Sequence, residues 1–426
     1  MYTVRYSPRF ALAPANPSEA DMKARIHRVL YDSDMTLTAV NQTAPRLRES
    51  EAEPLRILFC VNWPVDHLRE ADGTRFSPDY YVPGQPYWFF KHAHNNIDVD
   101  VLDCRSFLRL DRVERKWAHC YPSKGTLAWV RSRRYDLILS HGGQIGLVIG
   151  LLQSLFPDSS QPPHIMFDVG AISGGDSGWK NRIVTAGCRL AIRSLAAAIC
   201  HSSQQLEFYR AQYPEVAKIA HFIPLGVDTD QFRPEPCAQA DEIISVGYAK
   251  RDWELLVRAY AGLHTATRLV LLGIPSSQRI SHPGVVCVPR VSIDEMRRRV
   301  RRAKFVVLPL EKTDYCVGQQ TFLQSMALGK TVLLPKIPAV CDYIRDGETG
   351  FLYEVNSEQD LGRKLQALLS SGETIERVGH AARDATEAQF SEAMMADRIV
   401  GLLRDIVRNG SKPTACLIAR QNQNAQ

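Results

Sequence analysis

The chain has 426 residues, of which 45% are hydrophobic and 23% charged, a composition typical of a soluble globular protein with two domains of ordinary size. Its 52 Lys and Arg residues stand against 46 Asp and Glu residues and leave a net charge of +6. This small excess suits anionic partners such as nucleotides, but it is too weak to indicate a nucleic-acid-binding protein. Collagen-like and disordered classes of protein are excluded by the same composition.

The ten cysteines do not form a disulfide or zinc pattern. Cys60, Cys200 and Cys287 lie in apolar runs where cysteine acts as a small hydrophobic residue, and Cys-x-x-Cys pairs are absent. We expect free thiols in a reducing compartment. The N-terminus lacks a secretory signal, and apolar runs such as Gly146–Leu152 are too short to span a membrane. The sequence therefore predicts a cytoplasmic protein and leaves open a peripheral contact with a membrane.

The first part of the chain predicts one doubly wound α/β domain. Residues 1–54 are polar, with a helix candidate at Ser18–Leu30 and no assigned role. From Leu55 on, short apolar runs alternate with helix-like segments, as in a parallel sheet that is buried on both faces. The predicted strands are Leu55–Asn62, Ile97–Leu102, Tyr135–Ser140, His164–Asp168 and Ala197–His201, and the predicted helices are Gln144–Phe156 and Asn181–Leu195.

The same alternation restarts after Asp230–Asp241, a stretch with several turn-forming residues that we interpret as a linker. Ser292 and Glu295 form a capping box at the start of a helix, and Ser391–Val407 is predicted to be a terminal helix. The further predicted strands are Glu242–Gly247, Arg268–Gly273, Val285–Val288, Lys304–Pro309 and Thr331–Pro335, and a helix is predicted at Trp253–Leu263.

These patterns predict five parts of the chain. An N-terminal extension covers residues 1–54, two Rossmann-like doubly wound domains cover 55–232 and 241–390, a helix covers 391–408, and a polar tail covers 409–426. Two α/β units joined by a linker create a cleft, and such folds bind their ligands there.

The segment Thr313–Lys330, TDYCVGQQTFLQSMALGK, carries the strongest chemical signal. A loop containing Gly318 leads into a helix, whose N-terminal N–H groups and dipole suit a diphosphate. A glycine allows the backbone to approach phosphates without a Cβ clash. The alternative interpretation is an ordinary loop followed by a packed helix.

Three motifs in this chain resemble family 4 of the retaining glycosyltransferases. MALGKTVL followed by DYIRDGETGFL is similar to the family's E-A-M-A-x-G-x-P-V and D-G-x-x-G-x-L, and FIPLGVDTDQFRP is similar to I-P-N-G-V-D-x-x-x-F-x-P. The third is SVGYAKRDW, where the family has a glycine followed by basic residues. The resemblance covers roughly residues 55–405 and implies the GT-B fold, with an N-terminal acceptor domain and a C-terminal donor domain.

The chain departs from the family's pair of glutamates. Gln324 replaces the second, which in the family usually binds the nucleotide ribose, and Cys316 replaces the first, which lies near the donor sugar. Gln324 can still hydrogen-bond to hydroxyl groups. The run from Gly318 resembles a variant family loop, G-Q-x-T-x-L-E. The resemblance thus implies a donor site that includes Gly318, Gln319, Gln320, Thr321 and Gln324.

By the same resemblance, Lys250 and Arg251 occupy the position of the cations that bind the donor diphosphate, and Gly226 belongs to the donor-binding set. Fixed cations can stabilise a departing nucleoside diphosphate in place of Mg²⁺, and no carboxylate cluster for a metal is evident. Arg251 is the stronger candidate because its fork binds two phosphate oxygens. We also consider both side chains as solvated surface charges.

His141, at the end of a predicted strand, matches a region where many relatives have a histidine that contacts the donor. A structural role is the equal alternative. His141, Arg251 and Gln319 are the predicted catalytic residues. Asp168 and Trp63 are acceptor-site candidates, Trp63 within an aromatic-rich loop at Asn62–Trp88 whose rings could stack on sugars or simply pack. The alternative, which we favour, is that Asp168 is a turn or helix-cap residue.

The predicted function is transfer of a sugar from a nucleoside-diphosphate sugar to a carbohydrate, lipid-linked or other hydroxyl acceptor. The resemblance implies retention of configuration, with neither metal nor cofactor. The alternatives are a nucleotide-sugar epimerase or inverting transferase on the same fold, and a non-catalytic nucleotide-sugar-binding protein. A dehydrogenase is disfavoured because no G-x-G-x-x-G follows the first strand. The arginine-rich run Arg297–Arg302 is expected to be mostly solvated, with a membrane contact as the alternative.

Overall fold

The computed structural model describes residues 54–62, 88–93, 97–103, 114, 120–158, 160–168, 179–247, 250–275, 280–312 and 317–408. The predicted extension with its helix candidate and the polar tail lie outside these residues, apart from Pro54. Pro54–Ser173 and Ala186–Pro413 form one compact unit. A second unit consists of Met1–Glu53, Gly174–Thr185 and Thr414–Gln426. Of this unit, the structure describes only the first turns of α5 (Trp179–Ile192).

The first half of the chain forms a sheet of six parallel strands in the order β2-β1-β3-β4-β5-β6. Five of the strands agree with the sequence prediction to within two or three residues, because each is a short apolar run. β6 is a three-residue edge strand that the pattern did not predict. The strands are β1 (Leu55–Val61), β2 (Ile97–Leu102), β3 (Leu137–His141), β4 (His164–Phe167), β5 (Leu195–Cys200) and β6 (Ala220–Phe222).

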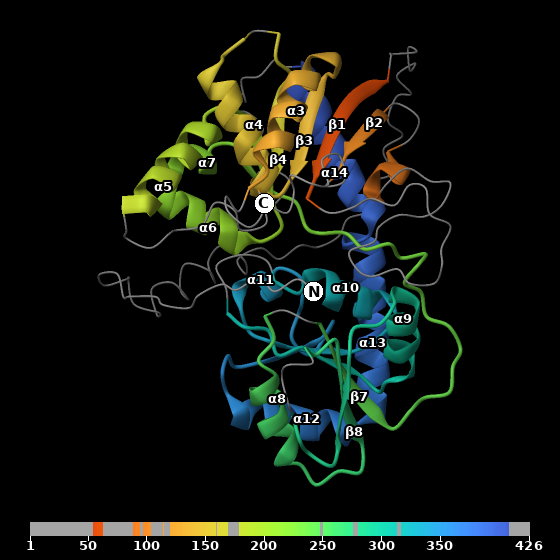
Figure 1. The fold of residues 1–426 in the computed structure, drawn as a ribbon. Helices are drawn as coiled ribbons and strands as arrows, with labels where there is room; N and C mark the ends of the chain where they lie inside the picture. The colour runs from red at the N-terminus through yellow and green to blue at the C-terminus, as the bar shows by residue number, and fades with distance from the viewer. Residues whose placement is uncertain are drawn as a thin grey trace, which may run out of the picture. The chain divides into compact units, whose positions relative to one another are not determined.

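Alternate residues of these strands bury their side chains under different layers. Leu58, Cys60 and Ile138 pack against α3 (Pro122–Arg131) and α4 (Gly143–Leu155). Ile57 and Phe59 belong instead to the core formed with the 3₁₀ helix η1 (Trp88–His92) and with α14 (Glu392–Arg408). Figure 1 shows α14 in blue beside β1. α14, the last helix within the described residues, therefore completes the core of the first sheet.

Further helices cover the β4–β5 end of this sheet. The C-terminal part of α5 packs there together with α6 (Ser203–Gln212) and the short α7 (Pro214–Ala217), through Ile192, Tyr209 and Val216. Met166 and Cys200 face these helices from the sheet. Helices on both faces of a parallel sheet confirm the predicted doubly wound architecture.

The second half forms another sheet of six parallel strands, in the order β12-β11-β10-β7-β8-β9. The structure confirms five predicted strands and adds β12. The strand predicted at Lys304–Pro309 is reduced to two residues, Val306–Val307. The strands are β7 (Glu242–Val246), β8 (Arg268–Leu272), β9 (Val285–Val288), β10 (Val306–Val307), β11 (Val332–Pro335) and β12 (Phe351–Tyr353).

Two groups of helices cover the two faces of this sheet. α8 (Trp253–Ala261) and α12 (Glu358–Leu369) pack on the face that carries Ile243, Leu271 and Leu333. The opposite face, with Ile244 and Leu308, packs against the remaining helices. These are α9 (Ile293–Arg302), α10 (Gln319–Ala327), α11 (Pro338–Cys341) and α13 (Gly372–Gln389).

Two local predictions are refined by the structure. Cys60 and Cys200 are buried thiols, but Cys287 is exposed because β9 is the edge strand of its sheet. In the predicted capping box, the Ser292 hydroxyl accepts from the Glu295 N–H at 3.3 Å. The Glu295 carboxylate pairs with Arg298 and Arg299 on the same helix. None of the described helices combines the length and apolar character that a membrane crossing requires.

Each sheet has one point at which the strand order reverses. In the first sheet it lies between β1 and β3, and in the second between β7 and β10. Loops leaving two such strands turn to opposite faces of the sheet, so the carboxyl ends of the strands leave a crevice where ligands bind. The candidate residues of the sequence can be tested against these two points.

Candidate functional site

The reversal point of the second sheet brings together two segments that are distant in sequence. After β7 the chain reaches Arg251, and after β10 it reaches Leu310, and these two residues form an isolated antiparallel bridge. The Asp252 N–H donates to the Pro309 carbonyl at 2.8 Å, and the Glu311 N–H donates to the Lys250 carbonyl at 3.2 Å. The loop after β10 then leads to Gly318 and α10.

Arg251 is held at this point by contacts along its whole guanidinium. Its Nε donates to the Val246 carbonyl at 3.2 Å, its Nη1 to the Lys250 carbonyl at 3.4 Å, and its Nη2 to the Thr321 hydroxyl at 3.4 Å. The residue is only 8% exposed. Charged groups in such surroundings are costly to bury without polar partners, and here backbone carbonyls and a hydroxyl supply them.

Gly318 places the start of α10 against Arg251. It is the N-cap of the helix and adopts the left-handed conformation, with φ 81°. A Cβ at this position would lie 2.7 Å from Leu310 Cδ2 and 3.5 Å from Arg251 Nη2. The first intrahelical bond runs from the Phe322 N–H to the Gly318 carbonyl at 3.1 Å. The N–H groups of the preceding turn therefore have no partner within the helix, and Gly318 and Thr321 of this turn lie next to the guanidinium.

The remaining predicted donor-site residues occupy different positions on the same helix. Gln319 is 3% exposed, and its Nε2 donates to the Ala339 carbonyl at 3.4 Å. Gln324 is 6% exposed, whereas Gln320 and Thr321 are partly exposed. Cys316 lies outside the described residues.

The side chain of Lys250 is fixed by fewer contacts than that of Arg251. Its ammonium lies 3.5 Å from the Glu311 carboxylate, and both side chains are more than a third exposed. Such surface pairs contribute little to stability. Of the two predicted cations, Arg251 is the one built into the reversal point.

His141 ends β3 at the reversal point of the first sheet, paired in register with Val61. Its ring lies 5.4 Å from the Trp88 ring and 5.3 Å from the Phe167 ring. Burial, with a smaller effect of His201, lowers the pKa of His141 to about 3. The imidazole is therefore neutral at pH 7, so it carries no positive charge and is able to donate or accept a hydrogen bond.

His201, which the sequence analysis did not single out, lies next along this edge. Its ring stacks on Phe167 at 5.7 Å, and its Nδ1 lies 2.7 Å from the Ile223 carbonyl. Its Nε2 is buried without a hydrogen-bond partner. His141, Phe167 and His201 thus place three neighbouring rings at the ends of β3, β4 and β5. The sequence could not reveal this arrangement, since it depends on which strands are neighbours.

Gly226 is required by a close approach of two backbones. A Cβ there would lie 2.7 Å from the Ser391 carbonyl oxygen and 2.8 Å from the Glu392 Cα. Backbone hydrogen bonds join Val227 to Phe390 and Glu392, both at 2.9 Å. In this structure the glycine thus has a packing role at the start of α14, and donor binding by Gly226 stays a prediction.

A buried ion cluster lies beside this junction. Lys91 of η1 pairs with Asp228 and, at 2.8 Å, with Glu392 of α14. Burial opposes the charge on Lys91, but the two carboxylates outweigh it and raise the pKa of the ammonium. Burial likewise opposes the charge on Asp228, yet Lys91 and two backbone N–H groups lower the pKa of its carboxyl. The aspartate of the I-P-L-G-V-D motif therefore has a structural role.

Of the two acceptor-site candidates, the structure describes Asp168 and not Trp63. Trp63 lies outside the described residues, and Trp88, from the same aromatic loop, is fully buried in the first core. Asp168 is 1% exposed and accepts hydrogen bonds from Tyr209 and Gln205. The carboxylate thus serves the interior of the domain through side chains of α6, a role that neither the acceptor-site interpretation nor the turn-or-cap interpretation included, and its acceptor role stays a prediction.

The segment Asp342–Tyr343, inside one of the family motifs, contacts the first half of the chain. Asp342 accepts from the Ser203 N–H at 2.8 Å and from its hydroxyl at 2.5 Å, at the start of α6. The Tyr343 hydroxyl donates to the His201 carbonyl at 2.7 Å and accepts from the Leu225 N–H at 2.9 Å. No local pattern signals these contacts, because both partners are far away in sequence.

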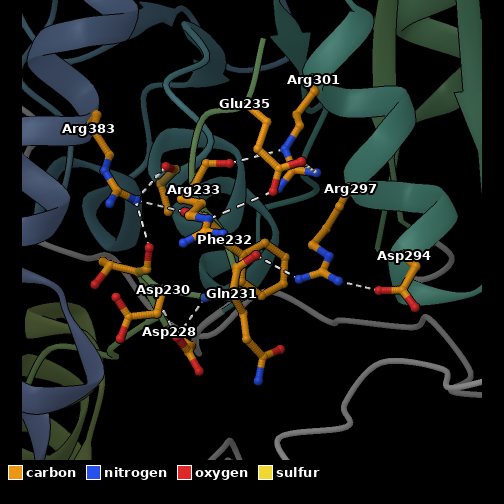
Figure 2. A network of polar contacts seen from close by, with 12 residues as sticks. Asp228, Asp230, Gln231, Phe232, Arg233, Glu235, Asp294, Arg297, Arg301 and Arg383 are labelled. Atoms are coloured by element: carbon orange, nitrogen blue, oxygen red, sulfur yellow. Dashed lines mark hydrogen bonds and ion pairs between the residues drawn. The ribbon is translucent and has the colours of Figure 1, made fainter. Parts of the chain in front are cut away.

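The arginine-rich run on α9 is largely paired. Arg297 pairs with Asp294, Arg298 and Arg299 pair with Glu295, and Arg301 pairs with Glu235 at 3.0 Å. Figure 2 shows that the side chains of Arg297 and Arg301 extend from α9 toward the linker. Arg298 and Arg302 are exposed and Arg299 is partly exposed, as expected for a mostly solvated run, whereas Arg297 and Arg301 contact the linker. A membrane contact stays without support.

The sequence of the second half matches a known protein family. Residues 240–371 match the family described as "Glycosyl transferases group 1". The curated D-inositol 3-phosphate glycosyltransferase of Acidothermus cellulolyticus is 24% identical over 235 residues, which cover 47% of this chain and 50% of that protein. The match thus spans about half the length of the curated relative.

Solved structures share the fold over most of the chain. HepE from Anabaena, solved in complex with UDP, superposes with a TM-score of 0.59 at 15% identity over 82% of this chain and 100% of that one. Sucrose-phosphate synthase from Thermosynechococcus elongatus gives 0.56 at 15% identity over 84% and 100%. A glycosyltransferase from Rickettsia africae gives 0.60 at 12% identity over 84% and 100%. These likenesses, with the two parallel sheets, confirm the predicted two-domain α/β fold of the GT-B kind.

Proposed function

We propose that this chain is a glycosyltransferase that moves a sugar from a nucleoside-diphosphate sugar to a hydroxyl acceptor. One observation carries the proposal. The Arg251 guanidinium lies against Thr321 in the first turn of α10, beside the left-handed Gly318, at the reversal point of the second sheet. This arrangement falls inside the residues that match the group 1 family.

The chemistry of this arrangement suits the departure of a diphosphate. When the bond from the sugar to the diphosphate breaks, negative charge accumulates on the phosphate oxygens. Arg251 supplies a fixed positive charge, and the N–H groups of the first turn of α10 supply oriented dipoles. Both are in place before the reaction, so little reorganisation is needed as the charge develops.

The donor and the acceptor are proposed by class. HepE was solved with UDP and with UDP and glucose, which supports a nucleoside-diphosphate sugar as the donor here. Gln320 and Thr321 are partly exposed on α10 and would contact the donor, and neutral His141 would hydrogen-bond to it. The acceptor is a carbohydrate, a lipid-linked sugar or another hydroxyl compound.

Retention and independence of metal belong to the same proposal. In the same-face reaction that the resemblance implies, the leaving phosphate would take the proton of the acceptor on the face from which it departs. In the described part of the chain, no group of three or more His, Cys, Asp or Glu side chains could hold a metal ion. Metal independence is tested by measuring transfer after treatment with EDTA and after addition of Mg²⁺ or Mn²⁺. Transfer should persist with EDTA and should not rise when either metal is added.

The function is tested in two steps. A thermal-shift screen with UDP, GDP and ADP should raise the melting temperature with at least one of them, because a ligand of the native state stabilises it. The matching labelled donor sugar is then incubated with a panel of hydroxyl acceptors. A glycoside with the donor's configuration is the expected product.

Other outcomes point to the alternatives. An inverted glycoside would mean an inverting transferase, and an epimerised donor would mean an epimerase. Binding of the nucleotide sugar without any product would indicate a non-catalytic binding protein, in line with Gln324 and Cys316 in place of the two glutamates. A chain that binds no nucleoside diphosphate would contradict the proposal itself.

A further inference from the structure

The linker between the two sheets has no regular secondary structure, yet its carbonyl groups are bound by arginine side chains. Arg297 Nη1 donates to the Gln231 carbonyl at 2.7 Å, and Arg301 Nε donates to the Arg233 carbonyl at 3.0 Å. Both arginines come from α9. A segment that forms no ladder must satisfy its carbonyls by other means, and in this linker guanidinium groups provide them (Figure 2).

Arg383 of α13 contacts the same linker and also a second element. Its Nη1 donates to the carbonyl of Thr229, the residue just before the linker, at 3.1 Å and to the Phe232 carbonyl at 2.7 Å. The Ala327 carbonyl lies 2.7 Å from the same nitrogen, whose two hydrogens are therefore shared among three carbonyl oxygens. Ala327 is the last residue of α10, so one guanidinium joins the linker to the end of the helix whose start adjoins Arg251.

The surroundings of Arg383 make this contact strong. Its side chain is 16% exposed, and its Nη2 pairs with Glu387 one turn along α13. A cation at the C-terminus of a helix is favoured by the helix dipole. Removing it would leave carbonyl oxygens of both the linker and α10 without their donor, which is costly in a partly buried place.

A displacement at one end of α10 reaches the other end. The helix has nine residues and a length of about 13.5 Å, and Phe322, Leu323 and Met326 pack it into the core of the second domain. Close-packed interiors have low compressibility and transmit strain. A shift at Ala327 therefore displaces Gly318 and the first-turn N–H groups relative to Arg251.

We propose that Arg383 is a positioning residue, which sets the place of α10, and with it the diphosphate-binding turn, relative to the linker between the two sheets. The inference rests on the proposed function for the identity of the ligand. It differs from a purely structural role, since the affinity for a nucleoside diphosphate must depend on a side chain that does not touch it.

The test compares Arg383→Met with Arg301→Met, using UDP as the probe. Both variants remove an arginine that binds the linker, but only Arg383 also binds α10. Calorimetry should give a UDP affinity about 2- to 30-fold weaker for Arg383→Met, the range of coupling energies carried by such contacts, and an unchanged affinity for Arg301→Met. Arg383→Lys, which keeps a cation with three donors, should restore the affinity.

Hydrogen exchange gives the second readout. The amides of α10 should exchange faster in Arg383→Met, whereas in Arg301→Met the increase should stay within the linker. Arg383→Gln replaces Arg383→Met if the latter does not fold. Equal loss of UDP affinity in the Arg383 and Arg301 variants, or unchanged exchange of α10 in Arg383→Met, would overturn the inference.

A wild-type protein that binds no UDP would count against a UDP-sugar donor and not against Arg383. In that case the exchange of α10 decides. Faster exchange in Arg383→Met alone would support the positioning role, and equal exchange in both variants would reject it.

Discussion

At the scale of single residues, the candidate site depends on the fixed geometry of Arg251. Its three donor nitrogens are directed by Val246, Lys250 and Thr321, which holds the guanidinium beside the start of α10. A flexible surface cation would lose conformational entropy on binding a ligand. For Arg251 most of that cost is met on folding, so its charge is available for a diphosphate at little further cost.

We therefore expect Arg251→Ala to weaken the binding of a nucleoside diphosphate by about 1.5–3 kcal/mol, the scale of a charged hydrogen bond. Isothermal titration calorimetry with UDP, GDP or ADP measures the change. Arg258→Ala is the matched control, because Arg258 lies on the adjacent α8 and is exposed in an ion pair with Glu358. Unchanged binding in Arg251→Ala, or an equal loss in the control, would remove Arg251 from the site.

At the scale of elements, the candidate site depends on the start of α10. Gly318 combines a left-handed backbone with close neighbours on two sides, Leu310 and Arg251. The bridge between Arg251 and Leu310 holds the loops after β7 and β10 together. The helix N-terminus thus lies beside a preformed cationic group.

Gly318→Ala should give a folded protein that is destabilised by about 1 kcal/mol, because an alanine strains the left-handed conformation. The added methyl group also pushes on Leu310 and Arg251, so the affinity for the nucleoside diphosphate should fall as well. Gly347→Ala is a close control, since Gly347 has φ 78° with nothing within 4 Å of the place of a Cβ. Urea unfolding and calorimetry measure the two effects.

The control should lose stability but keep its affinity. If both variants bind equally well, the crowding at Gly318 has no bearing on the site. If both lose affinity, the effect comes from general destabilisation.

At the scale of the whole molecule, histidines buried in the first sheet tie stability to pH. Burial lowers the pKa of His164 to about 3 and the pKa of His201 to about 4. An unfolded histidine titrates near pH 6.5. Between pH 6.5 and about pH 4 the unfolded chain binds protons that the folded chain does not, so stability rises with pH and is lost as the pH falls.

Each of these two histidines should lower the free energy of unfolding by up to about 2 kcal/mol when the pH falls from 7.5 to 5.0. Urea unfolding at the two pH values measures the loss. His164→Gln, which retains a group able to hydrogen-bond to Ser140, should lose less than the wild type. His380→Gln, a change at an exposed position on α13, should lose as much as the wild type. A wild-type loss in His164→Gln would show that His164 does not carry this dependence.

Most strands could be predicted because their signal is local. LRILFCV and EIISV are short, mostly apolar runs, and such runs are typical of buried parallel strands. α13 was not predicted, since its buried side consists mainly of small residues such as Gly379, Ala382 and Ala385. A stripe of this kind gives a weak hydrophobic period. β6 and β12 have three residues each, too few for a pattern.

The candidate site shows the same division. Motif resemblance selected Gly318, Thr321 and Arg251, and the structure brings these three together. Resemblance also selected Gly226 and led through its motif to Asp228, and there the structure provides packing and ionic reasons for the residue types. Arg383 carried no signal, because a guanidinium that binds backbone carbonyls leaves no requirement on the residue types of its partners.

By itself, then, the sequence determined two α/β halves, their principal strands, and a glycine before a helix in the second half. These features follow from local side-chain periodicity and backbone preference, which act over a few residues. Only the tertiary structure decided that β7 and β10 are neighbours, and that Arg251 therefore reaches Thr321, 70 positions along the chain. The physical reason is that strand order is set by the packing of helices on both faces of the whole sheet, which no local segment contains.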